Sequence, residues 1–177
     1  YLSDRHHNFI LEMVGEGPLL EEMKKHAQNL KIQNVVFFSG AIPPEQVREK
    51  MEESNIFLFT SNKEEGWGVV LNEAMNSGCA IVVNKAAGAV PFLINDGING
   101  FVYQNKNTRT LCNVVENLLV NMDLREQIAV MAYKTIIEKW TPQIAATRLI
   151  NQAEFLFSDE PGIKFMDGPV SFISYKK

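Results

Sequence analysis

Apolar residues along the chain form short continuous runs, and longer stretches with helical spacing separate these runs. Four runs are expected to be strands: residues 8–14, 34–38, 55–60 and 79–83. Between the first two runs, Leu20, Met23 and Ala27 mark one face of a helix, with charged residues on the other face. Continuous apolar strands between helices are typical of parallel sheets that helices cover on both faces. The pattern therefore predicts an α/β protein with a Rossmann-like, doubly wound parallel sheet.

The rest of the chain continues this pattern and then changes character. Residues 95–103 are expected to form a turn and a short strand, and helices should follow to about residue 157. Thr141 and Pro142 indicate an N-cap and a first helical residue of the last helix. Residues 1–157 are therefore interpreted as one domain and residues 158–177 as a C-terminal extension. Within the extension, residues 170–175 are a candidate edge strand.

Composition and charge exclude several classes of protein. The 177 residues are 46% hydrophobic, which allows a full core, and carry a formal net charge of −4. A nucleic-acid partner is not expected, because the chain lacks a basic stripe or patch. Two cysteines do not make a disulfide framework, and no spacing of metal ligands is present. No apolar run reaches the roughly 18 residues of a membrane span.

Candidate chemistry gathers at the carboxyl ends of the predicted strands, where ligands bind in doubly wound folds. Four loops with glycine lie there: residues 15–17, 39–42, 61–68 and 85–90. The third loop carries Glu65 and a Gly-Trp-Gly turn, and a helix from about Gly68 to Ser77 follows it. Backbone N–H groups at the start of a helix lack intrahelical partners and attract anions. This arrangement predicts a site for a diphosphate.

The spacing of two carboxylates extends this prediction. Glu73 lies about five residues into the helix, a rise of roughly 7–8 Å from its start, while Glu65 precedes the helix. The two acids are therefore expected to hold separate groups of a long ligand rather than to share a proton. A nucleotide-diphosphate sugar fits, with Glu73 at the ribose and Glu65 at the sugar. The alternative interpretation is a solvated acidic loop, with Trp67 packing on the sheet edge.

An ordered set of motifs resembles one enzyme family. The residues from Glu65 to Glu73 resemble the Glu-seven-residues-Glu motif of retaining glycosyltransferases of the GT-B architecture, and of the bacterial group 1 family in particular. Residues 13–18, 35–42, 88–91 and 96–102 resemble further signatures of this family, in the same order. The resemblance runs from about Phe9 to Phe157. It identifies the chain as similar to the C-terminal, donor-binding domain of such an enzyme.

The resemblance implies roles for individual residues. Glu65 would contact hydroxyls of the donor sugar and is the candidate catalytic residue, and Glu73 would hold the ribose. Ala41 and Ile42 would border the base. The full set of candidate donor-binding residues is Gly15, Glu16, Gly17, Ala41, Ile42, Glu65, Gly66, Trp67, Gly68, Val69, Val70 and Glu73. No metal or other cofactor is expected, because the nucleotide sugar is itself the substrate.

The resemblance also implies partners and a location. The expected partners are a nucleotide sugar and an N-terminal acceptor domain of the same polypeptide. Polysaccharide or glycolipid synthesis in the cytoplasm, with peripheral association at the inner membrane face, would follow. The chain opens at Tyr1 without an initiator Met, so we expect a piece of a longer polypeptide that lacks the first strand-helix unit and its diphosphate-neutralising Arg and Lys. The isolated piece is expected to be inactive.

Some features leave other functions open. Phe92 stands where the family often has an acid after a proline, so no acid can be assigned there. One alternative is a related sugar-nucleotide epimerase, although such enzymes need acids and histidines at other positions. A second is a non-catalytic domain that binds nucleotide sugars or regulates an enzyme. A third is a flavodoxin-like interaction module.

Overall fold

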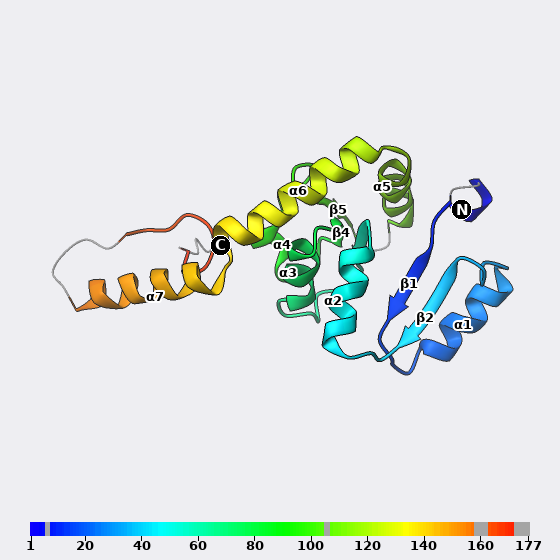
Figure 1. Cartoon of the computed structure of the whole chain (residues 1–177), viewed down its shortest axis with the longest axis horizontal. Helices are drawn as coiled ribbons and strands as arrows, with labels where there is room; N and C mark the ends of the chain where they lie inside the picture. Colours follow the sequence, from blue (N-terminus) through cyan, green and yellow to red (C-terminus); the bar gives the residue numbers. More distant parts are fainter. Residues whose placement is uncertain (6–7, 105–106, 158–162, 172–177) are drawn as a thin grey trace.

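The computed structural model describes residues 1–5, 8–104, 107–157 and 163–171 (Figure 1). Strands and helices alternate through the first 103 residues, and helices follow, as the sequence predicts. The elements in chain order are η1 (Ser3–Arg5), β1 (Leu11–Val14), α1 (Leu20–Asn29), β2 (Val36–Gly40), α2 (Pro44–Glu53), β3 (Ile56–Phe59), α3 (Val69–Asn76), β4 (Ala80–Asn84), α4 (Val90–Leu93), β5 (Phe101–Tyr103), α5 (Thr108–Val120), α6 (Met122–Lys139) and α7 (Pro142–Leu156).

All of the strand pairs in the named strands are parallel, which confirms the predicted fold class. The ladder is divided into two sheets, however: β1 pairs with β2, and β4 lies between β3 and β5. The apolar pattern did not predict this division, because it reports burial and not which strand edges are hydrogen-bonded. In Figure 1 the two-stranded sheet and α1 lie to one side of α2, and the three-stranded sheet lies to the other.

Strand β4 is the centre of the larger sheet. All five of its residues are buried, and its side chains alternate between two apolar clusters. Ile81 and Val83 enter the cluster to which α3 and the later part of α6 contribute, whereas Ala80 and Val82 enter the cluster to which α5 and Ile128 of α6 contribute. The expectation of a strand with helices on both faces therefore holds here in full.

The smaller sheet is less well covered than its apolar sequence suggests. The side chain of Phe37 in β2 is 47% exposed, and that of Val14 in β1 is 40% exposed. A carboxylate links this sheet to α2: the Ser39 hydroxyl donates to Glu12 Oε1 at 2.6 Å, and Lys50 Nζ lies 3.2 Å from the same oxygen. The hydrogen bond from Ser39, together with the Lys50 charge, lowers the pKa of Glu12 below its ordinary value.

Cys79 is a buried free thiol that connects two elements of the fold. Both cysteines are free thiols, and burial raises the pKa of the Cys79 thiol to about 11. Its Sγ donates to the Met51 carbonyl at 3.1 Å and so ties α2 to the start of β4.

Within the described parts of the chain, no helix combines the length and the apolar character that a membrane crossing requires.

The C-terminal part packs on α7, which begins as predicted and ends at Leu156. The Thr141 side chain accepts a hydrogen bond from the Ile144 amide at 3.2 Å, which confirms the N-cap. Residues 163–171 run back along this helix, where the Arg148 guanidinium lies 4.5 Å from the centre of the Phe165 ring. Most of the candidate edge strand lies outside the described residues.

Asn99 is the polar residue that fastens the β5 region to α6. Its side chain is 2% exposed and accepts a hydrogen bond from the Asn95 amide at 2.7 Å. Its Nδ2 donates to the Leu93 carbonyl at 2.9 Å and to Thr135 Oγ1 at 2.8 Å. Both polar atoms of its side chain therefore have partners in a place that water does not reach.

We predict that Asn99→Ala lowers the free energy of unfolding by about 2–3 kcal/mol, because several partners lose their hydrogen bonds in a buried site. Urea denaturation followed by circular dichroism measures this difference. The matched control is Asn113→Ala on the exposed face of α5, which should change the value by less than about 0.5 kcal/mol. Equal effects of the two substitutions would contradict the role of Asn99.

Candidate functional site

The β1–β2 ladder brings the first two candidate loops together. The Gly15 amide donates to the Gly40 carbonyl at 2.8 Å, just beyond an irregularity between Met13 and Val14 in the pairing. Gly15 has a φ of +123°, which favours glycine. The contact places the Gly15–Gly17 turn beside Ala41 and Ile42. These five candidate residues, including Glu16, therefore lie at one carboxyl end of the smaller sheet.

The third loop is shaped by a turn before Glu65. The amide of Glu64 donates to Asn62 Oδ1 at 2.8 Å, and the amide of Glu65 donates to the Asn62 carbonyl at 3.2 Å. Asn62 thus sets the direction in which the chain leaves β3 and places Glu65, which is half-buried.

Helix α3 begins at Val69, one residue after the predicted start. Gly68 caps it with a φ of +82°, and a Cβ at this position would overlap the Phe59 ring. Glycine is therefore required at Gly68 by both its backbone conformation and its packing. The amides of Val69 and Val70 stand at the helix start, where intrahelical acceptors are lacking. Glu73 lies on the same helix and is exposed.

The loop after β4 packs directly against this turn. Gly88 approaches Gly66 so closely that a Cβ at Gly88 would overlap the Gly66 carbonyl. Next to this approach, the Ala89 amide donates to the Trp67 carbonyl at 3.2 Å. Asn84, which is buried, accepts a hydrogen bond from the Ala86 amide at 3.1 Å and turns the chain into this loop. The two backbones thus hold each other at the carboxyl ends of β3 and β4.

The Trp67 side chain packs inward rather than standing at an open surface. Its ring centre lies 5.5 Å from that of Phe92 and 5.4 Å from that of Trp140. Its Nε1 donates to Asn72 Oδ1 at 2.9 Å. Packing on the sheet edge was the alternative interpretation of Trp67, and the geometry agrees with it for the ring. That the backbone of Trp67 contacts the donor nucleotide sugar remains a prediction.

The structure thus collects the candidate residues in two groups. One group contains Gly15, Glu16, Gly17, Ala41 and Ile42, and the other contains Glu65, Gly66, Trp67, Gly68, Val69, Val70 and Glu73. Asn62, Asn72, Gly88, Phe92 and Trp140 support the second group, and the sequence did not assign them to it. Gly88 and Asn62 carried a signal, because each belongs to one of the four loops with glycine, and Asn72 lies within the Glu65 to Glu73 motif. Phe92 and Trp140 are defined by tertiary contacts.

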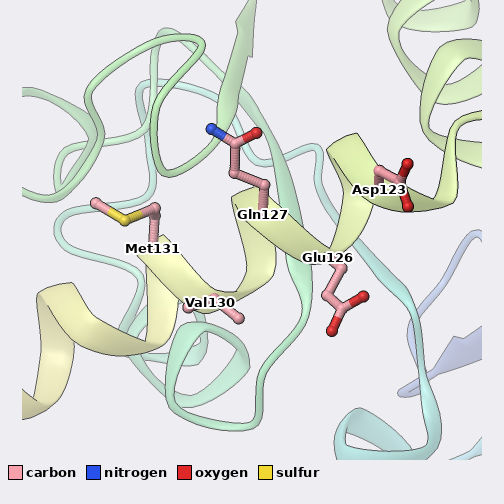
Figure 2. Close-up of a pocket in the computed structure, with 5 residues that line it drawn as sticks. All are labelled: Asp123, Glu126, Gln127, Val130 and Met131. Carbon is pink, nitrogen blue, oxygen red and sulfur yellow. The ribbon is translucent and has the colours of Figure 1, made fainter.

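A separate open groove lies along α6 (Figure 2). Its lining residues Asp123, Glu126, Gln127, Val130 and Met131 come from this single helix, and their side chains point in different directions. They do not converge on a common point as the groups of a binding site do. We therefore place the candidate site at the two groups of loops. Among the residues that the structure describes, no three His, Cys, Asp or Glu side chains form a cluster that could hold a metal ion.

We predict that Gly88→Ala lowers the free energy of unfolding by about 2 kcal/mol, since the added methyl group forces the two backbones apart. Gly17→Ala is the control, because a Cβ there meets no atom within 4 Å. Thermal unfolding of the three proteins compares them. A Gly88→Ala protein as stable as the unaltered chain would show that the loops separate without cost.

Comparisons with known proteins agree with this architecture. A poly(glycerol-phosphate) alpha-glucosyltransferase of Bacillus subtilis is 27% identical over 131 residues, which are 74% of this chain and 19% of the relative. An N-acetyl-alpha-D-glucosaminyl L-malate synthase of Bacillus anthracis is 27% identical over 149 residues, which are 84% of this chain and 37% of the relative. The chain therefore spans well under half of the length of these curated relatives.

Solved structures show the same fold. The Anabaena protein Alr3699/HepE in complex with UDP matches with a TM-score of 0.72 and 24% identity over 84% of this chain and 41% of that one. The C-terminal domain of LpcC, a glycosyl transferase group 1 family protein of Francisella tularensis, matches with a TM-score of 0.67 and 20% identity. That match covers 80% of this chain and 91% of the LpcC domain.

The sequence model that describes glycosyl transferases group 1 matches residues 1–135, which include both groups of candidate residues. Three observations thus agree: the parallel α/β fold, the ordered loops at its carboxyl edge, and this match over most of the chain. The chain belongs to the group 1 family of glycosyl transferases.

Proposed function

We propose that this chain is the donor-binding half of a retaining glycosyltransferase. The enzyme would transfer a hexosyl group from a nucleotide-diphosphate sugar to a glycan or glycolipid acceptor. One observation carries the proposal: a rigid glycine turn stands at the start of α3, with Glu65 before it and Glu73 within the helix. This turn offers unpaired amides for phosphate and carboxylates for hydroxyl groups on either side.

Each group of candidate residues takes one part of the ligand in this proposal. The amides from Gly66 to Val70 meet the sugar and the diphosphate, where the helix dipole favours negative charge. Glu73 accepts hydrogen bonds from the ribose, and Glu65 accepts them from the sugar. The turn at Gly15 to Gly17, with Glu16, lines the diphosphate side, and Ala41 and Ile42 border the base.

The proposed transfer keeps the configuration of the sugar. The acceptor hydroxyl attacks on the face from which the diphosphate leaves, and an oxygen of the departing diphosphate takes its proton. The amides at the start of α3 stabilise the charge that grows on the diphosphate as the bond breaks. No metal ion is required in this scheme, because backbone amides and the Arg and Lys expected in a preceding segment neutralise the charge.

The comparisons support the proposal at the level of the ligand. Structures of Anabaena Alr3699/HepE, which share the fold, are described in complex with UDP, with UDP and glucose, and with UDP-glucose. We propose the same ligand class for this chain. An N-terminal acceptor domain and a cytoplasmic site at the inner face of the membrane complete the proposed enzyme, which serves polysaccharide or glycolipid synthesis.

We predict that Glu73→Ala weakens the binding of UDP or GDP, whichever binds more tightly, by about tenfold, or about 1.4 kcal/mol, through the loss of one charge-assisted hydrogen bond. Isothermal titration with EDTA present measures the affinity. Glu138→Ala, an exposed glutamate of α6, is the control and should leave the affinity unchanged. Equal affinity of the Glu73→Ala protein and the unaltered chain would remove Glu73 from the ribose.

A second prediction concerns turnover by the 177-residue chain alone. We expect it to bind nucleotide but not to transfer or hydrolyse a nucleotide sugar, because the acceptor side of the cleft belongs to the proposed second domain. Incubation with UDP-glucose and with GDP-mannose, followed by assay of released nucleoside diphosphate, tests this. Catalytic release of the diphosphate would show that the chain has a complete active site.

A further inference from the structure

Trp67 connects the candidate donor turn to three other segments of the fold. Its Nε1 donates to Asn72 on α3, and its carbonyl accepts a hydrogen bond from the Ala89 amide. Its ring packs against Phe92 at 5.5 Å, with an interplanar angle of 32°. Contacts therefore hold both the side chain and the backbone carbonyl of Trp67. A shift of the Trp67 ring would for this reason also displace the backbone between Glu65 and Gly68.

The remaining contact of Trp67 comes from a distant segment. The Trp140 ring lies 5.4 Å away at an angle of 49°, a tilted geometry in which aromatic pairs attract each other. Trp140 is the C-cap of α6, and its amide donates to the Ile136 carbonyl at 2.9 Å. Both indoles pack against the apolar cluster that includes Phe59 and Leu71. The end of α6 therefore supports the donor turn through a contact that neither Asn72 nor Ala89 makes.

Trp140 lies directly before the last helix, α7. Thr141 is the N-cap of α7, and α7 has no buried residue. In Figure 1 this helix extends away from the two sheets, starting at the end of α6. Trp140 thus stands at the junction between α6 and α7, and its ring lies against Trp67 in the turn that also carries Glu65 and Gly66.

We propose that Trp140 is a positioning residue for the donor turn: its ring holds Trp67, and Trp67 holds the backbone from Glu65 to Gly68 in the form that meets the sugar and diphosphate of a nucleotide sugar. Trp140 itself touches no ligand. The inference rests on the proposed function for the ligand, while the packing it describes is independent of any ligand.

Hydrogen exchange of the free chain tests the packing part. In Trp140→Leu, we expect the Ala89 amide, which donates to the Trp67 carbonyl, to exchange about five- to tenfold faster, the size of effect that the loss of one aromatic pair gives. The amide of Val82 in the buried strand β4 exchanges only through global unfolding. Its exchange rate in Trp140→Leu should therefore rise only by the factor that the change in the free energy of unfolding gives. Trp140→Phe keeps a ring and should restore most of the protection of Ala89.

Nucleotide affinity tests the functional part. We expect Trp140→Leu to weaken UDP binding about five- to tenfold and UMP binding less than twofold, because UMP lacks the second phosphate that the turn would meet. A general loss of stability would not separate the two nucleotides, and Tyr133→Leu on the exposed side of α6 controls for it. If Trp140→Leu weakens both nucleotides equally, the positioning role is wrong.

The two measurements separate failure of this inference from failure of the proposed function. Unchanged exchange of Ala89 in Trp140→Leu would overturn the inference, whatever the ligand. Faster exchange of Ala89 together with no binding of UDP or GDP by the unaltered chain would support the packing role and count against the proposed ligand. The sequence has only two tryptophans, Trp67 and Trp140, so a far-ultraviolet exciton couplet that disappears in both Trp67→Phe and Trp140→Phe shows that the two rings pair in solution.

Discussion

Burial of β4 on both faces is the constraint on which the rest of the domain depends. Because its side chains alternate between two apolar clusters, helices must cover both faces: α3 and α6 contribute to one cluster, and α5 and Ile128 of α6 to the other. That arrangement fixes where β3 and β4 end, and therefore where their two loops meet. The approach of Gly88 to Gly66 is possible only because both strands end at the same edge. The candidate donor turn is thus a consequence of how the core is packed.

The turn itself is held by backbone and aromatic contacts rather than by charges. Gly68 needs its left-handed conformation, Ala89 donates to Trp67, and the ring of Trp67 packs against both Phe92 and Trp140. A site of this kind presents amides in a fixed direction before a ligand arrives, which lowers the reorganisation that binding requires. This agrees with an overall charge of −4, because a local cluster of amides can receive a diphosphate without a surrounding basic surface.

Belonging to the group 1 family gives these observations a common interpretation. Gly15, Ile42, Glu65 and Glu73 come from loops far apart in the sequence, yet each loop follows a parallel strand. Within each sheet, parallel strands bring their carboxyl ends to one edge, so the proposed site takes one group of loops from the smaller sheet and the other group from the larger sheet. The support for the second group from α6 then relates the proposed donor site to α7, the helix that leaves the domain.

The sequence by itself determined the fold class, the order of strands and helices, and the start of α3 to within one residue, because apolar runs, glycines and caps are local signals. It also placed each of the four loops at the carboxyl end of a strand. Only the tertiary structure decided that the strands form two separate sheets and that Phe37 stays half exposed, since hydrogen bonding between strands has no local signature. The same holds for Trp140: its contact with Trp67 joins two segments that no spacing relates, and packing alone brings them together.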